Sequence, residues 1–154
     1  MGCEEVVIKA PVSGHLIDIK DVADTVFSEK MLGNGIAILP DSGEIYAPFD
    51  SIVEQVFETK HAILLCGDNN VMALIHIGLN TVCLQGKGFE TFVKEGDTVK
   101  SGDLLIKADL DFIKANNYHT ITPIVVVNTN DYKEVCVINN NEPASVGTAI
   151  LRVK

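Results

Sequence analysis

The chain is poor in cysteine, and the cysteines that it has follow no pattern. Cys3, Cys66, Cys83 and Cys136 form no Cys-x-x-Cys pair and share no regular spacing. A disulfide framework is typical of short secreted chains rich in cysteine, and a zinc knuckle needs paired cysteines at fixed spacing. The sequence indicates neither, so we expect thiols that are buried or idle.

Long hydrophobic runs are also missing. Every apolar run is broken by Gly, Asn, Asp or a charged residue, and none approaches the roughly 20 apolar residues of a membrane-spanning helix. Residues 1–5 lack the basic and the apolar parts of a signal peptide, and Val6 stands where a myristoylation signal has Ser or Thr. We therefore expect a cytoplasmic protein.

Basic residues are outnumbered by acidic ones. The chain has 12 Lys and Arg against 21 Asp and Glu, which gives a net charge of −9. Such a chain repels nucleic acids and anionic membrane surfaces, and it attracts partners that present a basic face. We expect no nucleic-acid partner.

What the sequence does contain is typical of an antiparallel β protein. Its 154 residues suit one domain, and its hydrophobic fraction of 47% and charged fraction of 21% are those of an ordinary globular chain. Runs rich in Val, Ile and Leu recur about every eight to twelve residues, as in sandwiches and barrels. Turn-forming residues separate the runs, which cover residues 5–10, 15–19, 35–39, 51–57, 62–66 and 72–77. We predict an all-β fold, an antiparallel β-sandwich or barrel-like single domain over residues 1–154.

One or two short helices are expected beside the strands. Residues 110–117 read as helical, with Asp109 or Asp111 as N-cap and Phe112 and Ile113 on the inner face. Residues 28–32 could form one more turn, stabilised by packing rather than by length.

Two histidines come together in a predicted hairpin. The turn formers Gly67-Asp68-Asn69-Asn70 separate two apolar arms, and a two-residue or a four-residue loop gives the same register. In that register His61 lies directly opposite His76, with Cβ atoms roughly 4.5–5.5 Å apart on one face of the sheet. A slip of one residue would place the rings on opposite faces.

Thr59 joins this pair if the strand extends that far, because residues two apart share a face. Its hydroxyl can then hydrogen-bond an imidazole. A charge on one imidazole disfavours a charge on its neighbour, so one ring suits a nucleophile and the other an orienting group or acid. A single histidine is more often an ordinary surface or core residue, and we apply that interpretation to His15 and His119.

The segment Ile75-His76-Ile77-Gly78-Leu79-Asn80-Thr81-Val82 resembles the active-histidine signature of the glucose-type IIA family of bacterial sugar phosphotransferase systems. Further segments match in the family's order, at residues 26–40, 47–48, 57–62, 86–89 and 122–125. The resemblance thus covers nearly the whole chain. It implies a compact antiparallel β-sandwich that needs no cofactor and no metal.

The resemblance also implies roles for individual residues. Nε2 of His76 would accept a phosphoryl group from the phosphohistidine of HPr and pass it to a cysteine of the IIB domain. Nδ1 of His76 would be held by a backbone carbonyl, that of Gly78, while His61, hydrogen-bonded to Thr59, would support the phosphoryl oxygens.

A docking rim for these partners is implied by the same resemblance. The matching positions are apolar, although we expect some of them to be ordinary core residues; they are Val26, Phe27, Met31, Leu32, Phe57 and Val82. Asp24 and Asn80 occupy the acidic positions of the rim. The protein would be a monomer, peripheral to a membrane permease, and some relatives also bind regulated transporters or kinases when unphosphorylated.

Three residues depart from the family pattern. Asn80 stands where Asp is common, and Ser51 stands where Gly is usual. In Gly33-Asn34-Gly35, Asn34 stands at the Asp of the usual Gly-Asp-Gly. Asn80 removes one acidic group, which weakens a charge-assisted contact to arginines of IIB and bears on partner preference. Ser51 is interpreted as a turn adjustment.

Two alternatives remain from the sequence. Residues 93–104 have the double turn of biotinyl and lipoyl carrier domains, but Met-Lys-Met and Asp-Lys-Ala, which present the modified lysine there, do not occur. A zinc hydrolase on a related β scaffold could use two close imidazoles, but a third ligand and a His-x-His motif are missing.

Overall fold

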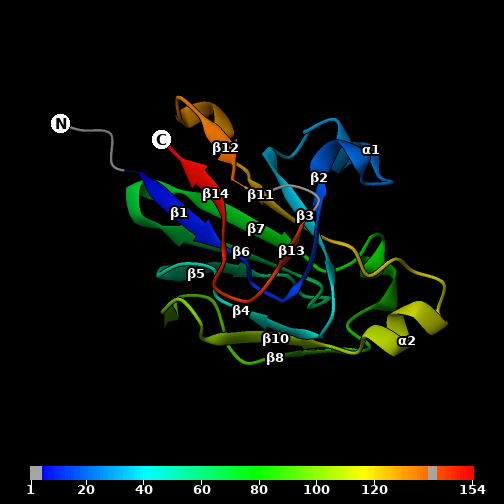
Figure 1. The fold of residues 1–154 in the computed structure, drawn as a ribbon. Coiled ribbons are helices and arrows are strands. Elements are labelled where there is room, and N and C mark those ends of the chain that lie inside the picture. Colours follow the sequence, from blue (N-terminus) through cyan, green and yellow to red (C-terminus); the bar gives the residue numbers. More distant parts are fainter. Residues whose placement is uncertain (1–4, 139–141) are drawn as a thin grey trace.

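A computed structural model describes residues 5–138 and 142–154, and these residues form three antiparallel sheets (Figure 1). The largest sheet has eight strands in the order β13-β2-β3-β11-β7-β6-β5-β9. Two three-stranded sheets accompany it, in the orders β1-β14-β12 and β4-β10-β8. The predicted antiparallel β-sandwich is confirmed.

The strands are short, as alternating apolar runs between turns require. Their bounds are β1 Val6–Lys9, β2 Gly14–Asp18, β3 Asn34–Pro40, β4 Glu44–Tyr46, β5 Ser51–Val56, β6 Ala62–Gly67, β7 Met72–His76, β8 Phe89–Thr91, β9 Thr98–Val99, β10 Leu104–Ala108, β11 Thr122–Val126, β12 Val135–Val137, β13 Pro143–Ala144 and β14 Ala149–Val153. The six predicted runs correspond to β1, β2, β3, β5, β6 and β7.

The helical elements are shorter still. They are α1 Thr25–Ser28 and α2 Leu110–Ala115, with the 3₁₀ turns η1 Ile19–Asp21, η2 Asp68–Asn70, η3 Thr81–Leu84 and η4 Thr129–Asp131. None of the helices in the described ranges is long and apolar enough to cross a membrane.

The helix α2 confirms the prediction for this region. The carboxylate of Asp109 caps it by accepting a hydrogen bond of 3.0 Å from the backbone N–H of Phe112. Ile113 is fully buried and anchors the helix to the core.

The helical turn predicted at residues 28–32 is wrong, because the turn lies earlier in the chain. Asp24 is the N-cap of α1, and its carboxylate accepts a hydrogen bond of 3.0 Å from the N–H of Val26. Lys30 adopts a left-handed conformation, with φ of 58°, which ends the helix before the predicted segment is complete.

The hydrophobic core has two parts, one on each face of the eight-stranded sheet. On one face the large sheet packs against both smaller sheets, through residues such as Ile63, Ile75 and Leu105. On the other face a smaller cluster lies under η1 and α1; it contains Ile19, Val22, Phe27, Ala37, Ala62, Leu74, Leu79 and Val125. His76 lies on this second face of the sheet, which only the smaller cluster covers among the described residues.

The cysteines of the described residues carry free thiols, as the sequence indicated. Cys66 and Cys136 are half-buried, whereas Cys83 is exposed. Cys3 lies outside the described residues.

The close approach of β3 to β11 depends on glycine at position 35. A Cβ at Gly35 would lie 2.0 Å from the carbonyl oxygen of Ile124 and 2.7 Å from Cα of Val125. These are backbone atoms at the centre of the sheet, so they cannot turn away.

We expect Gly35→Ala to lower the free energy of unfolding by about 3 kcal/mol, because the two strands must separate to admit the methyl group. Gly102→Ala is the control: nothing lies within 4 Å of its Cβ, and only its φ of 95° opposes the change. Urea unfolding of both variants measures the difference. A loss at Gly35 no larger than that at Gly102 would contradict this account of the sheet.

Candidate active site

The register of the hairpin β6–β7 differs by one residue from the predicted one. Ala62, not His61, pairs with His76, and Cys66 pairs with Met72. The loop has three residues, Asp68–Asn70, closed by a hydrogen bond of 2.9 Å from Gly67 to Val71. Two successive asparagines in left-handed conformation make this loop possible, with φ of 58° and 59°.

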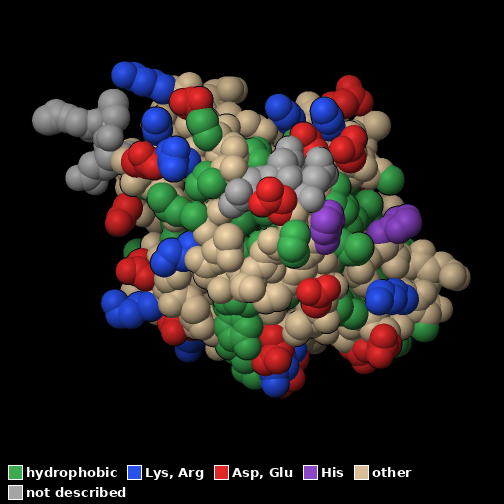
Figure 2. Space-filling view, in the orientation of Figure 1, with side chains coloured by type: hydrophobic (Ala, Val, Ile, Leu, Met, Phe, Trp, Pro, Cys, Tyr) green, Lys and Arg blue, Asp and Glu red, His purple; other side chains and the backbone are tan. Residues whose placement is uncertain are grey.

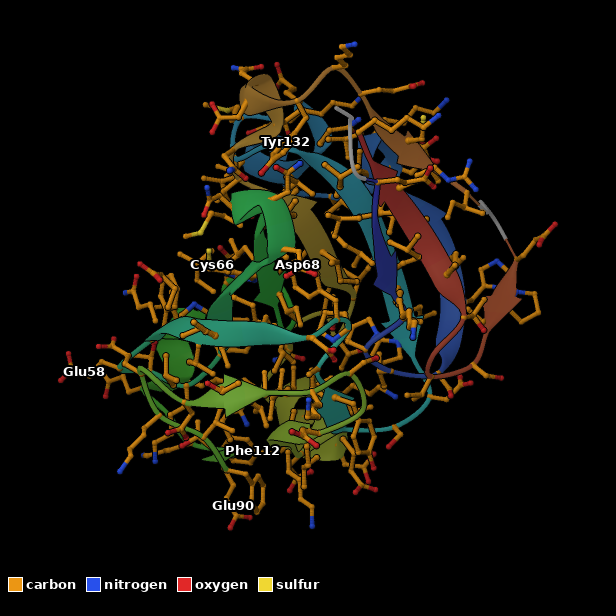
Figure 3. The ribbon with its side chains drawn as sticks, turned by 90° about the vertical axis from the view of Figure 1, so that its left-hand side faces the viewer. Glu58, Cys66, Asp68, Glu90, Phe112 and Tyr132 are labelled. Carbon is orange, nitrogen blue, oxygen red and sulfur yellow. The ribbon has the colours of Figure 1, made fainter. Side chains whose placement is uncertain are left out.

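The two imidazoles nevertheless meet. His61 is not part of β6: it is the last residue of the loop 57–61 that joins β5 to β6, so the alternation of strand faces does not apply to it. Lys60 turns the backbone with φ of 62°, and Glu58 lies at the outer tip of this loop (Figure 3). The ring centroids of His61 and His76 are 4.8 Å apart, with an interplanar angle of 81°. The predicted pair is confirmed, although the strand pairing that predicted it is wrong.

Thr59 holds the ring of His61 from the same loop. Its Oγ1 lies 2.7 Å from Nδ1 of His61, a hydrogen-bonding distance. The predicted contact is therefore confirmed, but it arises from the turn rather than from strand alternation. Only 4% of His61 is exposed to solvent.

The backbone carbonyl of Gly78 accepts a hydrogen bond from Nδ1 of His76, at 2.7 Å. A carbonyl only accepts, so this bond places the ring proton of neutral His76 on Nδ1 and leaves the lone pair on Nε2. Gly78 has φ of 77°, and a Cβ there would lie 2.6 Å from the methyl carbon of Thr81. Glycine is therefore required where this carbonyl turns toward the ring.

The chain that follows His76 is fixed at several points. The N–H of Ile77 donates to the carbonyl of His61 at 2.7 Å, and the N–H of Leu79 donates to the carbonyl of His119 at 3.1 Å. The hydroxyl of Thr81, which is fully buried, donates to the carbonyl of Ile77 at 2.5 Å. The sequence alone indicated a role neither for Thr81 nor for the backbone of His119. The side chains of His15 and His119 are exposed, as expected.

Two aromatic rings flank the imidazoles. The ring of Phe27 lies edge-on to His76 with centroids 5.0 Å apart, and the ring of Phe57 lies edge-on to His61 at 5.7 Å. Phe27 is only 3% exposed, so it belongs to the core rather than to the predicted docking rim. Phe57 is half-buried and packs against the same cluster.

Burial keeps both histidines neutral at pH 7. Desolvation, together with the smaller effect of the neighbouring His76, lowers the pKa of His61 from 6.5 to about 4. Desolvation also lowers the pKa of His76, while the Gly78 carbonyl and the negative charge of Asp24 act in the opposite direction. A neutral His76 is a competent nucleophile, because its Nε2 lone pair is free.

The remaining apolar residues of the predicted rim are exposed. Val26 is 37% exposed, Met31 69%, Leu32 38% and Val82 47%. Asn80 is exposed in a left-handed conformation, with φ of 60°, at the start of η3. Figure 2 shows acidic and basic side chains interspersed with exposed hydrophobic ones on the face that it presents.

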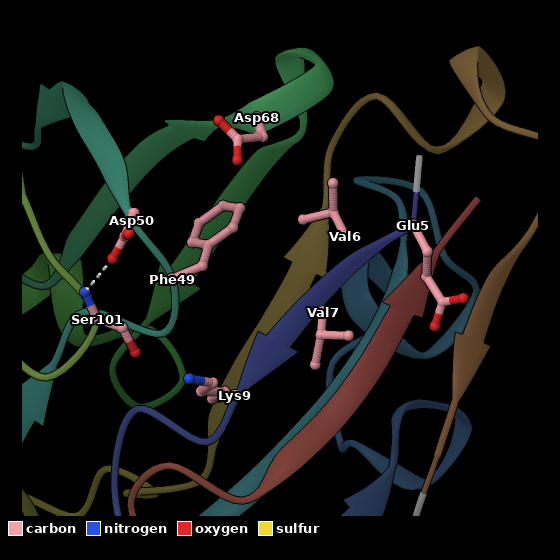
Figure 4. Close-up of a pocket in the computed structure, with 8 residues that line it drawn as sticks. All are labelled: Glu5, Val6, Val7, Lys9, Phe49, Asp50, Asp68 and Ser101. Carbon is pink, nitrogen blue, oxygen red and sulfur yellow. Dashed lines mark hydrogen bonds between the residues drawn. The ribbon is translucent and has the colours of Figure 1, made fainter. Parts of the chain in front are cut away.

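Other parts of the surface offer less chemistry. A hollow of about 240 Å³ beside β1 is lined by Glu5, Val6, Lys9, Phe49, Asp50 and Asp68, among others (Figure 4). Asp50 there accepts a hydrogen bond of 2.8 Å from the N–H of Ser101, and Glu5 pairs with Arg152. Neither His61 nor His76 lines it. Across residues 5–138 and 142–154, no three His, Cys, Asp or Glu side chains gather closely enough to hold a metal ion.

Comparison with known proteins matches this chain to one family. The family model described as phosphoenolpyruvate-dependent sugar phosphotransferase system, EIIA 1, matches residues 6–132. The chain is 43% identical over 150 residues to the glucose-specific EIIA component of the phosphotransferase system of Oceanobacillus iheyensis, covering 97% of this chain and 91% of that protein. It is 55% identical over 124 residues to the glucose-specific EIICBA component of Staphylococcus carnosus, covering 80% of this chain but only 18% of that longer protein.

A solved structure is similar over almost the full length. The glucose permease IIA from Mycoplasma capricolum superposes with a TM-score of 0.92 at 35% sequence identity, covering 99% of this chain and 97% of that one. These matches displace the biotinyl or lipoyl carrier and the zinc hydrolase considered from the sequence.

The burial of His61 predicts a specific dependence of stability on pH. Its pKa of about 4 in the folded protein lies below the value of 6.5 for a free imidazole, so between these pH values the unfolded chain binds a proton that the folded protein does not. The contribution is complete above pH 6.5 and is lost as the pH falls toward 4. Between pH 7 and pH 5 the loss amounts to about 2 kcal/mol.

Urea unfolding at both pH values, on the unaltered protein and on His61→Gln, measures this contribution as the difference between their pH dependences. An NMR titration of the His61 ring gives its pKa directly. A ring that titrates near 6.5, or two parallel stability curves, would contradict the assignment.

Proposed function

The chain belongs to the EIIA 1 family of the phosphoenolpyruvate-dependent sugar phosphotransferase system, and on this premise we propose that it carries the phosphoryl group on Nε2 of His76. The protein is a phosphocarrier of sugar uptake. Its activity is a phosphotransfer in two steps, from HPr to His76 and from His76 to a cysteine of a IIB domain.

One observation carries the proposal: the hydrogen bond from Nδ1 of His76 to the carbonyl of Gly78, at 2.7 Å. It commits the ring to the tautomer whose Nε2 lone pair is free to attack phosphorus. In the first step the N–P bond of the donor phosphohistidine breaks as the Nε2–P bond of His76 forms. The proton on Nδ1 stays in its bond to Gly78, so the step requires alignment and charge stabilisation rather than proton transfer.

His61 supplies the charge stabilisation. If the hydroxyl of Thr59 donates to Nδ1 of His61, Nε2 of His61 carries the proton and can donate it in a hydrogen bond to a phosphoryl oxygen. The low pKa of His61 favours its neutral form before transfer, and the dianionic phosphoryl group raises that pKa once it arrives. The ring can then take up a proton, and its positive charge stabilises the phosphoryl oxygens while the N–P bond breaks again; His76 keeps its own proton on Nδ1 and leaves as a neutral ring.

The partners dock on the rim around the two rings. Exposed Val26, Met31 and Val82 give an apolar contact that excludes water, and the net charge of −9 attracts a partner with a basic face. Asp24 provides an acidic group beside His76, whereas Asn80 does not. We propose that HPr and IIB use this same rim in turn.

The substitution His76→Ala should abolish phosphoryl acceptance and leave the fold intact, because the core does not depend on this half-buried ring. The test mixes the protein with phosphoenolpyruvate, enzyme I and HPr and measures the intact mass. His15→Ala, which removes an exposed imidazole from β2, is the control and should still gain one phosphoryl group. Acceptance by folded His76→Ala would overturn the assignment of the nucleophile.

The substitution His61→Gln should separate the two steps. His76 and its bond to Gly78 are untouched, so acceptance from phospho-HPr should continue at a similar rate. Onward transfer to IIB should slow by about 100-fold or more, because glutamine can donate a hydrogen bond but cannot take up the positive charge that stabilises the phosphoryl oxygens.

Single-turnover assays with phospho-HPr as donor and isolated IIB as acceptor measure each step alone. His15→Gln serves as the control in both. Equal slowing of the two steps, or no slowing of either, would rule out this role for His61 even if His76 is the nucleophile.

A further inference from the structure

The carbonyl of Gly78 can fix the tautomer of His76 only if the loop that carries it is itself fixed. This loop, residues 77–81, leaves the end of β7 and enters η3. Its backbone N–H groups are held at Ile77 by His61 and at Leu79 by His119, at 2.7 and 3.1 Å. Both of these bonds use backbone N–H groups of the loop. The carbonyl of Ile77, in the peptide between Ile77 and Gly78, still needs a hydrogen-bond donor.

That partner is the side chain of Thr81. Its hydroxyl donates to the carbonyl of Ile77 at 2.5 Å, four residues back in the chain, and both residues are fully buried. The methyl group of Thr81 lies against Gly78, where a Cβ would come within 2.6 Å of it. One side chain therefore fixes the Ile77 carbonyl and also packs against the residue whose carbonyl faces His76.

We propose that Thr81 is a positioning residue for phosphoryl transfer: its hydroxyl holds the Ile77 carbonyl so that the next carbonyl, that of Gly78, stays on Nδ1 of His76. Without the hydroxyl the Ile77 carbonyl is buried and unpaired, and the peptide rotates to find another donor. The Gly78 carbonyl then leaves the plane of the ring. His76 no longer keeps its proton on Nδ1 alone, and part of the protein carries it on Nε2, where it blocks attack.

This inference rests on the proposed function, but its first test does not. The tautomer of His76 is read from the ¹⁵N chemical shifts of its ring in the unphosphorylated protein, without any partner. In the unaltered protein and in Thr81→Ser, which keeps the hydroxyl, we expect the proton on Nδ1. In Thr81→Val, which has nearly the same shape and no hydroxyl, we expect a mixture of the two tautomers.

The second test measures transfer from phospho-HPr. Thr81→Val should lower kcat about tenfold with KM for HPr unchanged, because the docking rim is intact while the nucleophile is misaligned. Thr81→Ser should stay within about twofold of the unaltered protein. If Thr81→Val does not fold, Thr81→Ala removes the hydroxyl without adding a methyl group and takes its place in both tests.

A matched control distinguishes positioning from loss of stability. Thr129 in η4 also donates its hydroxyl to a backbone carbonyl, that of Val126, at 2.5 Å, and its oxygen accepts a hydrogen bond of 2.9 Å from the N–H of Asn34; Val126 pairs with Ala73, three residues before His76. Thr129→Val removes both bonds and should lower stability in urea without changing the tautomer of His76 or kcat. An unchanged tautomer in a folded variant without the Thr81 hydroxyl, or the same change in Thr129→Val, overturns the proposal. Failure of the unaltered protein to accept a phosphoryl group would instead count against the proposed function.

Discussion

The hydrogen bond between Nδ1 of His76 and the carbonyl of Gly78 is the constraint on which the rest of the site depends. A neutral imidazole has one proton and two nitrogens, and without a fixed acceptor it distributes that proton between them. The carbonyl removes this freedom, and burial beside Phe27 and His61 lowers the pKa so that the ring stays neutral. The proposed phosphoryl transfer needs both conditions. A charged ring, or a neutral ring with its proton on Nε2, has no lone pair on Nε2 to attack phosphorus. The surrounding structure therefore has to hold the carbonyl of Gly78 in place.

The large sheet accomplishes this through its two unequal faces. One face packs against both smaller sheets and makes the larger core, while the other is covered by η1, the single turn of α1 and loop residues such as Leu79. His76 ends β7 on the thinly covered face, where it is buried enough to lose much of its hydration and open enough for a partner to reach. Asp24 connects the two roles, because it caps α1 and also places a negative charge near His76.

Much of this arrangement could be predicted from the sequence, and the failures have identifiable causes. The early strands were predictable because their apolar runs are separated by turn residues, whereas β9 and β13 have two residues each and exist only through pairing with distant strands. The pairing of His61 with His76 was predicted from an even-numbered loop, but two left-handed asparagines allow three residues there. The wrong register did not change the predicted proximity of the two rings. The turn at Lys60 places His61 outside β6, so the alternation of strand faces does not decide where its ring points. The sequence thus predicted that His61 and His76 lie close together, but it did not predict the geometry of the loops that bring them there.

The departures from the family pattern also differ in their physical consequences. Asn34 uses both ends of its amide: Oδ1 accepts from the N–H of Gly35 at 2.9 Å, and Nδ2 donates to the carbonyl of Val135 at 3.0 Å. An aspartate could accept the first bond but would oppose a second acceptor with its charge, so asparagine suits the local backbone that joins β3 to β12.

Asn80 is different, since it is exposed beside the site and its left-handed conformation suits asparagine and aspartate alike. Its effect is therefore on the charge of the proposed docking rim rather than on the fold. Under the proposed function, a rim with Asp24 as its acidic group near His76 would depend more on apolar contact with its partners and less on paired charges.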